Sequence, residues 1–143
     1  MPFSMQIVPA ALALFTLFAA PLHAAAISVM PTRLEIPAGS TQTTMTIRAG
    51  RDEGVAVQIR VFAWAEGQPP TQISPTNAVA VSPPIAQIGR RQELTVRIVR
   101  TARSAVRGRE CYRVLVDTLP TQAEGSGRIA LRMRHSVPLC FNG

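Results

Sequence analysis

Few residues of this 143-residue chain combine the chemistry and the spacing that catalysis or metal binding requires. There are two cysteines, Cys111 and Cys140, and outside the N-terminal segment a single histidine, His135, which we expect to be exposed or hydrogen-bonded. These three residues do not have the spacing of a metal site. No second carboxylate lies at a suitable place beside Glu110, and no nucleophile motif is present. We therefore expect no enzyme activity, no cofactor, no metal and no small-molecule substrate.

The positive charge of the chain comes entirely from arginine. Fifteen arginines, no lysine and 8 acidic residues give a net charge of +7. Such a charge is compatible with binding to nucleic acid or to an acidic membrane surface. The arginines are scattered through strand-like segments, however, without an aromatic platform or a basic cluster. We expect no nucleic-acid partner.

The N-terminal segment predicts export. Residues 5–20 are apolar but too few to span a membrane comfortably, and the alanine-rich residues 21–26 follow them. This order predicts a secretory signal peptide over residues 1–26, although no lysine or arginine precedes the apolar run. A membrane anchor is the alternative interpretation. In an oxidising compartment, an even pair of cysteines suggests a disulfide.

The rest of the chain reads as short alternating segments separated by turns, without a long helical period. This pattern predicts an all-β fold, a seven-stranded immunoglobulin-like β-sandwich with Greek key connections, as one domain over residues 27–143. Pro31 interrupts the first segment, so that strand lies at an edge or switches sheets. Trp64 is expected in the buried core. The predicted strands are residues 27–36, 41–50, 55–64, 79–89, 93–100, 109–120 and 128–141.

The last segment, Arg128–Phe141, has the clearest alternation and ends the sequence. A pleated strand with this period has one apolar face and one polar face. Such a strand either anchors its own sandwich or acts as a template for another chain. The apolar parity comprises Ile129, Leu131, Met133, Val137, Leu139 and Phe141.

Four segments, taken in order, resemble a known family. They are VMPTRLEIPAGSTQTTMTI, VAVQIRVFAW, VAVSPPIAQIGRRQELTVRI and RECYRVLVDTLP. They are similar to the N-terminal domain of periplasmic pilus-assembly chaperones of the chaperone–usher pathway. The resemblance implies a periplasmic chaperone that binds pilus or fimbrial subunits and delivers them to an outer-membrane usher. The family has a second immunoglobulin-like domain, so we expect either a fragment or a one-domain remnant that is inactive.

The resemblance also implies donor-strand complementation, in which the chaperone lends its last strand to a subunit that lacks one. Carried over to this sequence, the donor residues are Ile129, Leu131 and Met133. The later apolar residues of the same segment then belong to the domain's own core or to a domain junction. The alternative is that all of them face the sandwich of this chain.

Two basic residues bind the C-terminal carboxylate of the subunit in the family. Arg33 matches the first of them, and an arginine fork suits a carboxylate. The second is a lysine of the last strand, but Pro138 occupies that position here. Arg113 and Arg134 are the candidates for the second charge.

Cys111 and Cys140 are nearly equidistant from the connection at residues 121–127. In an antiparallel hairpin, such positions are cross-strand neighbours and can be bridged. The resemblance points the same way, because some branches of the family carry a disulfide between these strands. Two free thiols are the alternative. A secreted immunoglobulin-like adhesin or pilus subunit is the competing function.

Overall fold

The computed structural model describes residue 1, residues 26–120 and residues 131–143, which contain ten β-strands and no helix. The predicted signal peptide therefore lies almost entirely outside the described residues. Within them no helix is long and apolar enough to cross a membrane. The strands are β1 (Ile27–Met30), β2 (Leu34–Ile36), β3 (Gln42–Ala49), β4 (Val55–Trp64), β5 (Ile73–Pro75), β6 (Val79–Ser82), β7 (Ile85–Ile88), β8 (Glu93–Arg100), β9 (Arg109–Thr118) and β10 (Arg134–Asn142).

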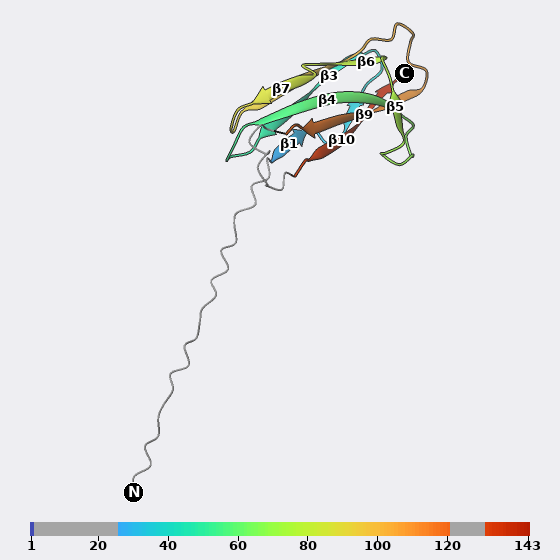
Figure 1. The fold of residues 1–143 in the computed structure, drawn as a ribbon. Helices are drawn as coiled ribbons and strands as arrows, with labels where there is room; N and C mark the ends of the chain where they lie inside the picture. The colour runs from blue at the N-terminus through green and yellow to red at the C-terminus, as the bar shows by residue number, and fades with distance from the viewer. Residues whose placement is uncertain (2–25, 121–130) are drawn as a thin grey trace.

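The strands form two sheets that enclose one core, so the predicted all-β immunoglobulin-like sandwich is confirmed. One sheet has the order β1-β3-β8-β6, and the other has the order β2-β10-β9-β4-β5, with β7 also paired to β4. Figure 1 shows β4, β9 and β10 side by side. Alternate residues of both sheets point inward and are buried, as the period-2 pattern requires. The most deeply buried side chains include Met45, Ile47, Ile59, Val96, Ile98, Val114, Leu139 and Phe141.

The number of strands differs from the seven expected, and prolines explain most of the difference. Pro31 divides the first predicted strand into β1 and β2, which belong to different sheets. Pro83 and Pro84 likewise separate β6 in one sheet from β7 in the other. Proline cannot donate a ladder hydrogen bond, so a strand tends to break or change partner there. The short β5 was missed because it lies in a proline-rich stretch that reads as loop.

The last strand is shorter than predicted within the described residues. Strand β10 starts at Arg134, whereas Leu131–Met133 are described but lie outside any strand. Residues 128–130, including Ile129, lie outside the described residues. The antiparallel partner, β9, ends at Thr118, so little of this chain's own sheet remains for the preceding residues to pair with.

Two further expectations need correction. Trp64 is buried, but on the outer face of its sheet and not between the sheets, because its parity is opposite to that of the core residues Val55, Val57 and Ile59. His135 was expected to be exposed or hydrogen-bonded. It is half-buried, and its Nδ1 has no hydrogen-bond partner among the described residues.

Candidate functional site

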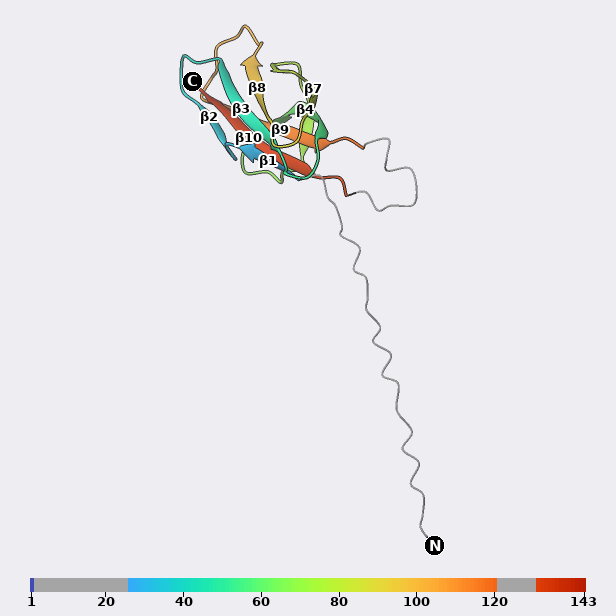
Figure 2. The same cartoon turned by 90° about the vertical axis from the view of Figure 1, so that its left-hand side faces the viewer.

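Strand β10 has one covered edge and one edge that is only partly covered. It pairs with β9 from Arg134 to Asn142, but with β2 only from Leu139 to Phe141. Figure 2 shows β2 beside β10. The first half of β10 therefore has no strand on its outer side among the described residues. Unpaired backbone groups of this kind can accept a strand from another chain.

The apolar residues just before this edge are exposed. Leu131 has an exposed fraction of 57% and Met133 of 39%. They contrast with Val137, Leu139 and Phe141, which are at most 4% exposed and contribute to the core of this chain. Side chains of the same parity thus lie in two environments. Those in the second half of β10 are buried in the core, whereas those just before β10 begins are exposed.

The start of β10 is held in place by its neighbours. Two hydrogen bonds join Met133 and Thr118: the Met133 N–H donates to the side-chain Oγ1 of Thr118 at 2.9 Å, and the Thr118 N–H donates to the Met133 carbonyl at 3.0 Å. Asp117 is mostly buried and accepts hydrogen bonds from both Arg134 and Arg60. Burial raises the pKa of the Asp117 carboxyl, but these two arginines outweigh it and hold the pKa below its usual range. This ion network ties β4, β9 and β10 together at the point where the exposed segment begins.

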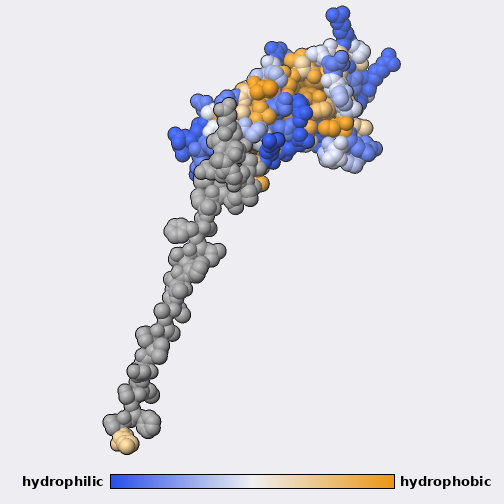
Figure 3. Space-filling model, in the orientation of Figure 1, coloured by the Kyte–Doolittle hydropathy of each residue, from blue (hydrophilic) through white to orange (hydrophobic). Residues whose placement is uncertain are grey.

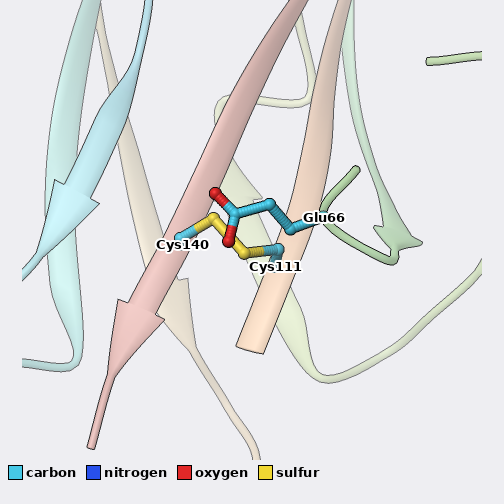
Figure 4. Close-up of side chains that lie close together, drawn as sticks. All are labelled: Glu66, Cys111 and Cys140. Carbon is cyan, nitrogen blue, oxygen red and sulfur yellow. A yellow bond between two sulfur atoms is a disulfide. The ribbon is translucent and has the colours of Figure 1, made fainter. Parts of the chain in front are cut away.

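The two cysteines form a disulfide. Cys111 on β9 and Cys140 on β10 are opposite each other in the strand register and are bonded through their sulfur atoms. Glu66 lies against this bridge, as Figure 4 shows, and the three residues were the only described group with metal-ligand geometry. Because the sulfur atoms are joined to each other, neither is available as the thiolate that a metal site needs.

Arg33 lies directly before β2 and belongs to an exposed ion network. Its Nε donates to Glu35 at 2.7 Å and its Nη2 donates to Glu66 at 3.0 Å. Arg109 holds both of these carboxylates as well. The hydrogen bonds from Arg109, followed by those from Arg33, lower the pKa of Glu35 to about 2. Arg33 is therefore not a free surface arginine, because its fork already contacts two carboxylates.

Arg113 and Arg33 come from neighbouring places in the sheet, because Arg33 directly precedes Leu34, the partner of Leu139, and Arg113 is the partner of Pro138. Its guanidinium carbon lies 4.0 Å from the centre of the Trp64 ring, and its Nε is buried without a hydrogen-bond partner among the described residues. Burial lowers the pKa of Arg113, and the neighbouring charge of Arg33 lowers it further. Two close cations, one with an unused buried donor, are suited to binding an anion.

The structure distinguishes between the two arginines considered for the second charge. Arg113 is the register partner of Pro138, so it lies on the neighbouring strand beside the position where a basic residue was expected. Arg134 lies several residues before Pro138 on β10, where it is ion-paired with Asp117 of β9. Arg113 is therefore the better placed of the two.

Glu66, Glu35 and Arg109 were not singled out as site residues from the sequence. Glu66 follows β4 in a turn, and nothing in its local pattern indicates that it reaches Arg33 from another element. Figure 3 shows hydrophilic residues and apolar patches interleaved on the face of the molecule that Figure 1 presents. By contrast, the alternation along the strands predicts that the side chains of Arg60, Arg113 and Arg134 point away from the core.

The fold and this site define an immunoglobulin-like β-sandwich in which one edge of the last strand is only partly covered among the described residues. A family model described as "Pili and flagellar-assembly chaperone, PapD N-terminal domain" matches residues 26–142. The chain belongs to this family, whose members are assembly chaperones and not enzymes. No curated protein is significantly similar to the chain in sequence.

Several solved structures have the same fold. The chain is similar to a chain in the CsuC–CsuE chaperone–tip adhesion subunit complex of Acinetobacter baumannii, with 25% identity, a TM-score of 0.69 and coverage of 83% of this chain and 57% of that chain. The Salmonella enterica SafA pilin–SafB chaperone complex gives 21% identity, a TM-score of 0.69 and coverage of 85% and 56%. The E. coli chaperone DraB gives 22% identity, a TM-score of 0.66 and coverage of 84% of this chain and 56% of that chain. This chain thus spans little more than half the length of the chains that it matches.

Proposed function

We propose that this domain is the subunit-binding part of a periplasmic pilus-assembly chaperone and that it captures incompletely folded pilus subunits by donor-strand complementation. The observation that carries the proposal is that one edge of β10 is partly open and that Leu131 and Met133, directly before this strand in the sequence, have exposed side chains. A partner strand would satisfy the backbone groups of that edge, and the apolar side chains would enter the partner's open core.

The division of β10 supports this mechanism. Its second half fills the core of the domain with Val137, Leu139 and Phe141, so the strand is firmly anchored while its first half remains accessible. In the proposal Ile129, Leu131 and Met133 form the donor row, with Ile129 taken from the sequence alternation alone. Since the sandwich has its own last strand, the competing interpretation as a pilus subunit that lacks one is less well supported.

The same proposal assigns Arg33 and Arg113 to the subunit's C-terminal carboxylate. Arg33 can offer a planar fork of N–H donors, and Arg113 adds a second positive charge and a buried Nε that has no partner among the described residues. Binding a carboxylate there would fix how far the subunit strand runs along β10. Delivery of the bound subunit to an outer-membrane usher completes the proposed role.

Co-expression with a pilus subunit that lacks its last strand tests the proposal. The wild-type chain should yield a soluble one-to-one complex, and the double variant Leu131→Arg/Met133→Arg should not. The control variant Thr44→Arg/Thr95→Arg adds the same two charges to exposed positions of the other sheet and should leave capture unchanged. Full capture by the Leu131→Arg/Met133→Arg variant would refute donor-strand binding.

A further inference from the structure

Glu66 reaches Arg33 from a different part of the chain. Its carboxylate accepts hydrogen bonds from Arg33 Nη2 at 3.0 Å and from Arg109 Nε at 2.7 Å. Glu35, by contrast, is two residues from Arg33 and is placed there by the start of β2. The Glu66 contact therefore depends on how the turn after β4 is folded against the sheet.

That turn is built to hold its position. The Trp64 indole N–H donates to the Gln68 carbonyl at 3.0 Å, and the Gln68 N–H donates to the Ala65 carbonyl at 3.1 Å. Gly67 has φ of 88°, a left-handed conformation that favours glycine. Figure 4 shows the resulting placement of Glu66, with its carboxylate over the Cys111–Cys140 bridge.

We propose that the Glu66 carboxylate occupies, in the free domain, the side of the Arg33 fork that the terminal carboxylate of a bound subunit takes, and that it must be displaced for binding. This inference rests on the proposed function. Arg33 binds a carboxylate most strongly through two parallel N–H groups. Glu35 holds Nε, so the parallel pair left for an incoming carboxylate is Nη1 and Nη2, and Glu66 already accepts a hydrogen bond from Nη2.

Glu66 makes the longer of the two Arg33 contacts, 3.0 Å against 2.7 Å for Glu35, so it is the acid that can leave with the smaller loss. It keeps its hydrogen bonds to Arg109 when it releases Arg33, and its side chain is 43% exposed, so no buried charge is left without a partner. Displacement of Glu66 replaces its exposed ion pair with Arg33 by an ion pair between Arg33 and the subunit's terminal carboxylate. A weakly bound anion would gain little from it, whereas a subunit that also pairs with β10 has additional contacts that offset the exchange. Glu66 thus makes the site selective for a carboxylate attached to a matching strand.

The test uses the full chain and a synthetic peptide with the sequence of the C-terminal strand that a pilus subunit does contain, prepared with a free C-terminal carboxylate and with a C-terminal amide. The measured quantity is the ratio of the two dissociation constants. We expect wild type to prefer the acid and Glu66→Gln to increase this preference by about two- to five-fold, the range of an exposed ion pair. The control Glu93→Gln removes the same charge from an exposed pair with Arg48 on the other sheet and should leave the ratio unchanged.

The outcomes separate this inference from the proposed function. An unchanged or smaller acid preference in Glu66→Gln, with wild type preferring the acid, would overturn the inference and make Glu66 only a brace for Arg33. If wild type binds the acid and the amide peptide equally, the assignment of a carboxylate-binding site to this domain is wrong. Arg33→Gln should abolish the acid preference. Thermal unfolding of each variant verifies that the fold is intact.

Discussion

The disulfide between β9 and β10 allows a stability prediction worked from the structure. Cys111 and Cys140 are separated by 29 residues, so the bridge closes a loop of this length in the unfolded chain. The chain-entropy model gives a stabilisation of roughly 3–4 kcal/mol for such a loop. Domains of this kind have unfolding free energies of about 5–15 kcal/mol in total, so the loss is a substantial fraction. We expect Cys111→Ala/Cys140→Ala to fold but to be less stable by roughly 3–4 kcal/mol.

Urea unfolding followed by tryptophan fluorescence measures this difference. The same experiment on reduced wild type is the essential control, because it removes the cross-link without changing side-chain volume. If the bridge acts on the unfolded chain, reduced wild type and the double variant should have similar midpoints, both below oxidised wild type. They should also have a larger m-value, because an uncross-linked unfolded chain exposes more surface. Equal midpoints for oxidised and reduced wild type would refute the reasoning.

Three other predictions concern the same strand and its neighbours. Asp117→Asn should lower stability by about 1–3 kcal/mol at pH 7, since it weakens charge-assisted hydrogen bonds of a mostly buried carboxylate. The folded-state pKa of Asp117 is lowered, so the contribution of its carboxylate to stability is present above the unfolded-state pKa and is lost as the pH falls through the folded-state pKa. In thermal melts at successively lower pH, the difference in stability between wild type and the variant should therefore disappear. Phe141→Ala should cost about 3–5 kcal/mol in urea unfolding, because the ring is fully buried and packs edge-to-face on Tyr112 at 6.0 Å; a cost below 1 kcal/mol would contradict that packing. Leu131→Arg/Met133→Arg should change stability by no more than about 0.5 kcal/mol, as measured by thermal unfolding, because both side chains are exposed; a large loss would mean that they belong to this domain's own core.

Several features could be predicted because they depend on local pattern. Alternation along β10 placed Val137, Leu139 and Phe141 on one apolar face, and of the two places expected for them, the domain's own core and a domain junction, the structure has the core. Pro31 indicated an edge strand or a change of sheet, and the chain does change sheet there. The equal distance of the two cysteines from the intervening connection correctly made them cross-strand neighbours. The donor residues remain a prediction, and Ile129 lies outside the described residues.

Other features could not be read from the chain. Trp64 was assigned to the core from its size and apolarity, yet its parity places it on the outer face, beneath Arg113. Asp117 gave no signal of a role, because the two arginines that surround it come from different strands. The strand count was wrong since prolines divide continuous apolar patterns between sheets.

The sequence by itself determined the all-β class and the two faces of each long strand, because side-chain direction in a strand alternates with every residue and needs no knowledge of its partners. The tertiary structure decided which edge of β10 is left open, which arginine lies beside Pro138 and which acid reaches Arg33. Those relations join residues that are far apart along the chain, and they follow from strand order and register. Register is set by the packing of the whole sandwich and not by any one segment.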